Sequence, residues 1–253
     1  MKNFHWLPGV PVKEVLARYE NSPGKELESK FENPESSANL VANAFGWFMQ
    51  RPSSLPPLPG CEQLGVVEDV CVERCMRFPW RGGLHPWLDV VVETPQALIG
   101  VESKRYEPFR PKAAATRWST AYRRNVWGSR MAGFQRMRDL LDSGKEEFQH
   151  LNAVQLVKHA FGLRTQAAKD GGRRPVLLYV YAEPRNWPDG KAVPARQLKI
   201  HREEIAAFAR IVAGDEVEFH SASYAQVLAT WTASGDSDVR SHAAAVHTRY
   251  EGC

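Results

Sequence analysis

Residues 87–104 read WLDVVVETPQALIGVESK, and this stretch decides the fold. Its two ends, residues 87–93 and 97–104, are apolar and rich in β-branched side chains, and the turn residues Thr94-Pro95-Gln96 separate them. A third run of this kind covers residues 64–75, in which valine recurs four times. Three such runs on short connections predict an antiparallel meander of three strands.

The chain on either side of this meander has patterns of helices and further strands. Ser36 or Ser37 can cap a helix that extends to about Met49, because a serine oxygen accepts from the free amides of a first turn. The complete pattern predicts an α/β fold with a central mixed β-sheet flanked by helices. We expect one domain over residues 1–253, with its core at about 26–231 and a polar, flexible C-terminal tail at about 234–253. The expected later helices cover residues 126–141, 151–169, 201–213 and 224–231, and the expected later strands cover 175–181 and 217–220.

Composition places the chain among ordinary globular proteins. It has 253 residues, of which 43% are hydrophobic and 25% charged. It lacks the roughly 18 to 20 consecutive apolar residues of a membrane span, and its first residues lack the pattern of a secretion signal. We therefore expect a cytoplasmic protein with no membrane partner. Cys61, Cys71 and Cys75 are conceivable zinc ligands, but no C-x-x-C pair is present, and reduced thiols are the expected state.

The meander ends in a pattern of acids and one lysine that suggests metal chemistry. Alternate residues of a strand share a face, so Glu102 and Lys104 project together. A hairpin-like return would bring Asp89 beside Glu102. Two carboxylates and a carbonyl oxygen, such as that of Ser103, are hard ligands of the kind that Mg²⁺ prefers. The lysine could orient the attacking water or stabilise charge on a phosphate. A structural salt bridge between Glu102 and Lys104 is the alternative reading.

With these residues, the chain resembles the PD-(D/E)xK nuclease superfamily, whose members have the restriction-endonuclease-like fold. The matching elements are Pro86-Trp87-Leu88-Asp89 and Glu102-Ser103-Lys104, although Trp87-Leu88 stands between the proline and the acid. The resemblance implies a hydrolase, a deoxyribonuclease that cuts phosphodiester bonds as an endonuclease with Mg²⁺, for which Mn²⁺ would substitute. It gives Asp89, Glu102 and Lys104 the catalytic roles, and Asp89, Glu102 and the Ser103 carbonyl the metal.

Two further segments are similar to one bacterial branch of that superfamily. Its first-helix signature resembles Glu35-Ser36-Ser37 and Asn43-Ala44-Phe45-Gly46, and its glutamine-containing helix resembles residues 155–159. The resemblance implies a first-helix acid as an additional metal ligand, for which Glu35 is the candidate, with Glu32 and Glu28 as competitors. A carboxylate that only stabilises a helix N-terminus is the alternative for Glu35. Gln155 is a candidate assisting residue, and a plain surface glutamine is its alternative.

Positive charge gathers directly after Lys104. Residues 101–140 hold ten Lys or Arg and three Asp or Glu, and aromatic residues alternate with the basic ones. Basic groups neutralise phosphates and aromatic faces stack on bases, so this segment favours DNA as a partner. A solvated basic face is the alternative, and some of the aromatic residues must belong to the core. The candidate DNA contacts are Arg105, Arg110, Lys112, Arg117, Arg123 and Arg124.

Three functional readings therefore follow from the sequence. The leading one is the Mg²⁺-dependent DNA endonuclease, for which cutting of both strands would favour a homodimer. The second is a nucleic-acid-binding protein that uses the same fold without cutting DNA. The third is a partner-dependent subunit that acts beside a helicase or a modification protein. One fold hosts several functions, so the fold alone does not choose among the three.

Overall fold

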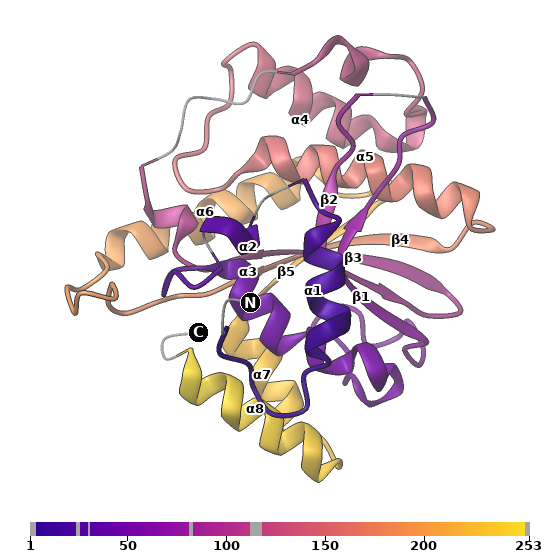
Figure 1. Cartoon of the computed structure of the whole chain (residues 1–253). Helices are drawn as coiled ribbons and strands as arrows, with labels where there is room; N and C mark the ends of the chain where they lie inside the picture. The colour runs from indigo at the N-terminus through magenta and orange to yellow at the C-terminus, as the bar shows by residue number, and fades with distance from the viewer. Residues whose placement is uncertain (1–3, 24–25, 30, 81–82, 112–117, 251–253) are drawn as a thin grey trace.

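The computed structural model describes residues 4–23, 26–29, 31–80, 83–111 and 118–250. Its centre is a five-stranded sheet in the order β1-β2-β3-β4-β5 (Figure 1). The first three strands are antiparallel, as the sequence predicts, and β3, β4 and β5 are parallel to one another. The strands are β1 (Asp69–Cys75), β2 (Trp87–Glu93), β3 (Ala97–Lys104), β4 (Arg174–Tyr181) and β5 (Glu218–Ser223).

Helices cover both faces of this sheet (Figure 1). One apolar cluster joins one face of the sheet to α1, α3, α7 and α8. A second cluster joins the opposite face to α4, α5 and α6. The predicted α/β fold, a mixed sheet between helical layers, is thus confirmed. The helices are α1 (Val12–Glu20), α2 (Glu26–Ser29), α3 (Ser37–Ala44), α4 (Ala132–Asp142), α5 (Ala153–Lys169), α6 (Ala195–Val212), α7 (Tyr224–Thr232) and α8 (Ser237–Arg249), and the short 3₁₀ turns are η1 (Gly46–Gln50), η2 (Pro52–Ser54), η3 (Glu107–Phe109), η4 (Thr120–Arg123) and η5 (Ser129–Met131).

Strand β3 lies in the middle of the sheet and is buried on both faces. Ile99 and Val101 point into one apolar cluster and Leu98 into the other. This double burial explains the continuous apolar run in the sequence. Gly100 leaves room for neighbouring side chains, since a Cβ atom there would lie 2.5 Å from Leu88 Cδ1. The central position of β3 places its polar end, residues 102–104, at one end of the sheet between the two helical layers.

Two of the predicted boundaries near the N-terminus are wrong. Strand β1 begins at Asp69 and not near residue 64. Ser36 does cap the predicted helix, because its side chain accepts from Asn39 N at 3.1 Å. However, α3 ends at Ala44, and a 3₁₀ turn continues to Gln50. The aromatic residues that follow Ala44 pack into the core from this tighter turn.

The expected flexible tail at 234–253 is also wrong for the residues that the structure describes. Residues 237–249 form α8, which packs on α3 and α7. Val239, Ala243 and Val246 are buried at helical spacing. The hydroxyl of Tyr250 donates to Asn39 Oδ1 at 2.6 Å. Small alanines and few large apolar residues hide this helix in the sequence, although one of its faces is fully packed.

Among the helices of the described residues, none is long and apolar enough to pass through a membrane.

Candidate active site

The antiparallel pairing of β2 and β3 brings two of the predicted acids together. The paired register ends with Val90 opposite Val101, so Asp89 and Glu102 are the next residues outward. At this position Ser103 N donates to the side-chain atom Asp89 Oδ2 at 2.6 Å, where a regular ladder would have a backbone carbonyl oxygen as the acceptor. The side chain of Asp89 therefore lies against the Glu102–Ser103 peptide, as the hairpin-like return predicts.

Glu102 is held beneath helix α5. Its side chain is only 1% exposed, and its two carboxylate oxygens face two different basic side chains. Lys104 Nζ contacts Oε1, and His159 Nδ1 lies 3.0 Å from Oε2. Apart from these two contacts, neither oxygen has a hydrogen-bond partner among the residues that the structure describes. Burial acts to raise the pKa of Glu102, but Lys104 and His159 outweigh burial and lower it to about 2. Glu102 is therefore an anion at neutral pH.

The negative charge of Glu102 shifts the pKa values of the neighbouring groups Asp89 and Lys104. Burial and the charge of Glu102 raise the pKa of Asp89 well above its usual range, although Lys104 and the Ser103 amide act in the opposite direction. Burial acts to lower the pKa of Lys104, but Glu102 and Asp89 outweigh it and raise that pKa. Lys104 therefore stays a cation and cannot serve as a base. Two close carboxylates with one ammonium form a site that an additional cation would stabilise.

The donor set suits a hard metal ion that keeps part of its water. Within the described part of the chain, no group of three or more His, Cys, Asp and Glu side chains could hold a metal ion. Mg²⁺ does not need such a cage, since one or two carboxylates with water and substrate phosphates satisfy it. The buried oxygens of Glu102, which face Lys104 and His159, and the carboxylate of Asp89 are hard oxygen donors of the kind that this requirement names. We conclude that the residues present fit Mg²⁺.

The Ser103 carbonyl is directed to the same side as Asp89. Ala182 N donates to Lys104 O at 2.8 Å, so the Lys104 carbonyl faces β4. Successive peptide groups of a strand face opposite neighbours, and the Ser103 carbonyl therefore faces β2. Ser103 also makes contact across the sheet, where its Oγ lies 2.7 Å from Tyr224 Oη. A carbonyl ligand at Ser103 is thus compatible with the backbone.

A third acid lies beside Asp89 on the next strand. Val72 pairs with Val90 and Arg74 with Leu88, so Glu73 is the residue opposite Asp89. Its backbone has φ of +50°, a left-handed conformation that is costly for a residue with a Cβ atom. Burial, Glu26 and Glu102 raise the pKa of Glu73 to about 7. Nothing in the sequence singles out Glu73, because an acid within the polar end of an edge strand carries no local signal.

The predicted first-helix ligand is engaged in an ion pair. Glu35 forms a two-point ion pair with Arg110, whose Nε lies 2.8 Å from Glu35 Oε2. The competing residues Glu28 and Glu32 have exposed side chains. Glu26, which the sequence analysis does not consider, is the acid near this end of the chain whose charge reaches Glu73. The pair with Arg110, 75 residues away in the chain, is a contact that sequence spacing does not reveal.

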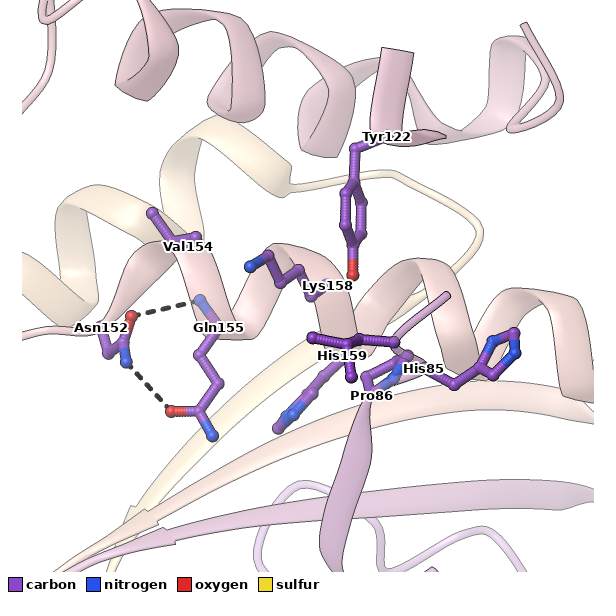
Figure 2. Close-up of a pocket in the computed structure, with 9 residues that line it drawn as sticks. His85, Pro86, Tyr122, Asn152, Val154, Gln155, Lys158 and His159 are labelled. Carbon is purple, nitrogen blue, oxygen red and sulfur yellow. Dashed lines mark hydrogen bonds between the residues drawn. The ribbon is translucent and has the colours of Figure 1, made fainter. Parts of the chain in front are cut away.

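The glutamine-containing helix is α5, and its first turns lie next to the acids. Gln155 lines a pocket together with His159, the residue that contacts Glu102 (Figure 2). Its amide oxygen accepts from Asn152 Nδ2 at 3.1 Å. Gln155 is half-buried, in a recess and not on an open surface. His159 is a residue of the site to which the sequence analysis assigns no role, since its approach depends on how α5 packs on the sheet.

The six basic candidates have different surroundings. Arg105 is 8% exposed and donates to the Pro34 carbonyl, so its burial argues against a phosphate contact. Arg110 is paired with Glu35, and Arg123 with Asp142. Arg124 is exposed, with its guanidinium 4.7 Å from the centre of the Trp80 ring. Lys112 and Arg117 lie outside the described residues. Five of the aromatic residues of this segment are core residues: Tyr106, Phe109, Tyr122, Trp127 and Phe134.

A family model described as "Restriction Endonuclease associating with ARP" matches residues 2–251, nearly the whole chain. No curated protein and no solved structure matches the chain significantly.

Proposed function

The chain belongs to the family of restriction endonucleases associating with ARP, and from this premise we propose that it is a Mg²⁺-dependent endonuclease that hydrolyses phosphodiester bonds in DNA. Membership in the family supports a nuclease-type function. The observation that supports the finer assignment is the hydrogen bond from the Ser103 amide to the Asp89 carboxylate. Ser103 is the residue between Glu102 and Lys104, which form an ion pair. This arrangement collects two acids and one ammonium at the end of a buried sheet.

In this proposal each residue has a separate task. Asp89, Glu102 and the Ser103 carbonyl would hold Mg²⁺, with Mn²⁺ as a substitute. When bound, the ion would supply Lewis acidity toward the phosphoryl group that is attacked. Lys104, a permanent cation beside Glu102, orients the attacking water and offsets negative charge that develops on the phosphate. His159 positions Glu102 by its contact with Oε2.

The test is cutting of supercoiled plasmid DNA by the purified chain in Mg²⁺ or Mn²⁺. We expect Lys104→Met to slow cutting by roughly 100-fold or more, which is typical for loss of a group that stabilises transition-state charge. Asp89→Asn should abolish metal binding in calorimetry and cutting with it. Lys199→Met is the matched control, because Lys199 is an exposed lysine on α6. Unchanged cutting by both site variants would contradict the proposal.

A second candidate is a nuclease that acts only beside a partner protein. The family description, which names an association with ARP, favours this candidate. The same calorimetry separates the two. A chain that binds Mg²⁺ through Asp89 but leaves DNA intact would support the partner-dependent subunit. A chain that neither binds the metal nor cuts DNA would instead support a binding protein without catalysis.

A further inference from the structure

A pocket lies on the α5 side of the acids. Its volume is about 220 Å³. That is smaller than the roughly 300–1,000 Å³ of pockets that enclose a drug-sized ligand, so it suits one group of a larger molecule. His159 belongs to its wall and also contacts Glu102, so this side chain links the pocket to the acids. The lining residues are Leu84, His85, Pro86, Tyr122, Asn152, Val154, Gln155, Lys158 and His159 (Figure 2).

The lining favours an anion. It contains one ammonium, two imidazoles, two amides and one phenol, and no carboxylate. Lys158 is half-buried, and desolvation lowers its pKa. Its Nζ lies 5.3 Å from the centre of the Tyr122 ring, and no ion pair joins it to an acid among the residues that the structure describes. A partly desolvated cation without a carboxylate nearby is stabilised by a bound anion.

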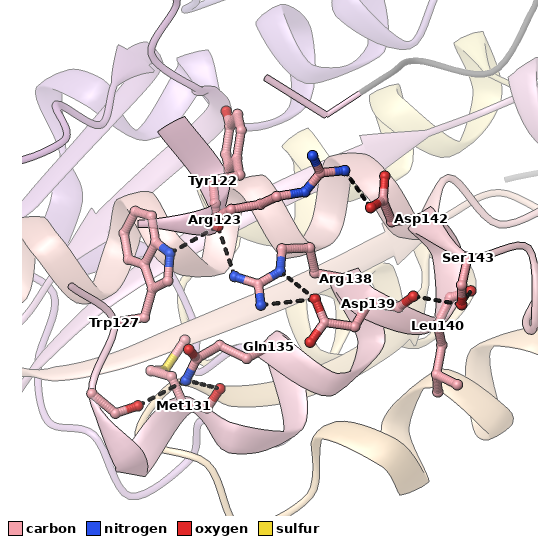
Figure 3. A network of polar contacts seen from close by, with 11 residues as sticks. Tyr122, Arg123, Trp127, Met131, Gln135, Arg138, Asp139, Leu140, Asp142 and Ser143 are labelled. Atoms are coloured by element: carbon pink, nitrogen blue, oxygen red, sulfur yellow. Dashed lines mark hydrogen bonds and ion pairs between the residues drawn. The ribbon is translucent and has the colours of Figure 1, made fainter. Parts of the chain in front are cut away.

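The opposite wall of the pocket is fixed by a polar network behind it (Figure 3). The carbonyl of Tyr122 accepts from Arg138 Nη1 at 2.7 Å and from Trp127 Nε1 at 3.1 Å. Arg138 is 9% exposed and Trp127 is fully buried. These two donors hold η4 in place, so that the Tyr122 ring extends toward Lys158 and His159 (Figure 2). Burial raises the pKa of Tyr122 to about 12, and its hydroxyl therefore remains a neutral donor.

We propose that this pocket binds a phosphate group of the DNA strand adjacent to the phosphate that is cut, through Lys158 Nζ, the Tyr122 hydroxyl and the Gln155 amide. The proposal rests on the proposed function, because the pocket gains its role from the nearby reaction centre. Charge-assisted hydrogen bonds from an ammonium are the usual means of binding a phosphate. The phosphate has two conceivable sources, an internal phosphodiester of the strand or a 5′-terminal phosphate.

The first measurement is binding of a labelled DNA duplex in EDTA at several salt concentrations. We expect Lys158→Met to weaken binding about tenfold and to reduce the slope of log K against log salt by about 0.9, the value for one phosphate contact. Tyr122→Phe should weaken binding about threefold, the effect of one neutral donor, without a change in slope. Lys199→Met alters the net charge by the same amount as Lys158→Met and should leave the slope unchanged.

The second measurement distinguishes the two sources of phosphate. If the pocket takes a 5′-terminal phosphate, the chain will bind 5′-phosphorylated duplexes more tightly than 5′-hydroxyl duplexes, and Lys158→Met will remove that difference. If it takes an internal phosphodiester, the two duplexes will bind alike, and Lys158→Met will also slow the cutting of circular DNA. Either result supports the pocket. Equal affinity and salt slope for Lys158→Met and Lys199→Met on all duplexes would overturn it.

Two controls keep this test separate from folding and from catalysis. Removal of a half-buried charge should leave the thermal midpoint of Lys158→Met unchanged or higher, so that weaker binding is not a sign of unfolding. Tyr122→Phe retains the ring and the backbone carbonyl that Arg138 holds. Because binding is measured without metal, this experiment tests the pocket even if none of the proteins cuts DNA. A failure to cut DNA would count against the proposed function and not against the pocket.

Discussion

At the scale of single residues, His159 acts together with Lys104 to keep the buried acid Glu102 ionised. Its Nδ1 lies 3.0 Å from Glu102 Oε2, and both side chains are almost fully buried. His159→Phe keeps the volume and removes this contact. The pKa of Glu102 should then rise from about 2. As the pH falls, Glu102 should therefore take up its proton at a higher pH in the variant than in the wild type. We expect the acid limb of the pH–rate profile to move to higher pH. An unmoved limb would show that Lys104 alone sets the charge of Glu102.

Glu73 is a residue whose strain and charge can be separated. Glu73→Ala removes the carboxylate but retains the cost of φ +50°, whereas Glu73→Gly removes both. We expect the glycine variant to be more stable than the alanine variant by about 1 kcal/mol, or roughly 2–4 °C in thermal midpoint. If the carboxylate contributes to the reaction centre, both variants will cut DNA equally slowly. Equal thermal midpoints would show that the backbone of Glu73 is not strained.

At the scale of elements, the close approach of α5 to the sheet depends on a glycine. A Cβ atom at Gly162 would lie 2.7 Å from Met76 Cβ and 2.7 Å from Pro86 Cγ, neither of which is the end of a flexible chain. Gly162→Ala should therefore destabilise the protein by about 1–3 kcal/mol in urea unfolding, although alanine is the better helix former. Gly235→Ala, where nothing lies within 4 Å, is the control and should have little effect. A stabilised Gly162→Ala variant would show that α5 can move away without cost.

The elements also show where sequence reasoning succeeds. Strands β2 and β3 match their predicted bounds, because the alternation, the turn and the polar ends are local signals. The meeting of Asp89 and Glu102 follows from that same local pairing. The wrong result for α8 has a different cause. Its buried face consists largely of small or weakly apolar residues, and this face is buried because α8 packs against α3 and α7.

The parts of the site that the sequence misses depend on contacts between distant segments. His159 reaches Glu102 only because α5 docks on the sheet, and Glu35 is taken by Arg110 from another loop. Glu73 is recognisable only by its register opposite Asp89 and by its backbone angle. No periodicity reports such contacts. The roles of Asp89, Glu102 and Lys104 stay predictions until cutting and metal binding are measured.

At the scale of the whole molecule, stability should depend on pH through His242. This buried ring of α8 stacks on Trp47, and its Nε2 lies 3.0 Å from the Ala44 carbonyl oxygen. Burial lowers its pKa from 6.5 to about 4. The unfolded chain therefore binds a proton more readily than the folded chain. Stability present above pH 6.5 is lost as the pH falls toward 4, by up to about 3 kcal/mol.

The measurement is the free energy of unfolding in urea between pH 7.5 and pH 4. His242→Phe retains an aromatic ring against Trp47 and removes the titrating group. We expect a shallower loss of stability in this variant than in the wild type over that range, since other groups titrate equally in both. Parallel curves for the two proteins would mean that His242 accepts a proton in the fold as easily as in the unfolded chain.

The amide of Ser103 offers a spectroscopic view of the reaction centre. Its proton is held by the side chain of Asp89 in place of a backbone carbonyl of the neighbouring strand, while the hydroxyl of the same residue meets Tyr224 on the far side of the sheet. A nuclear magnetic resonance signal from this one N–H would report whether Asp89 has turned toward a newly arrived ion. The same signal would register a disturbance of the C-terminal helices, so a single resonance monitors both layers of the molecule.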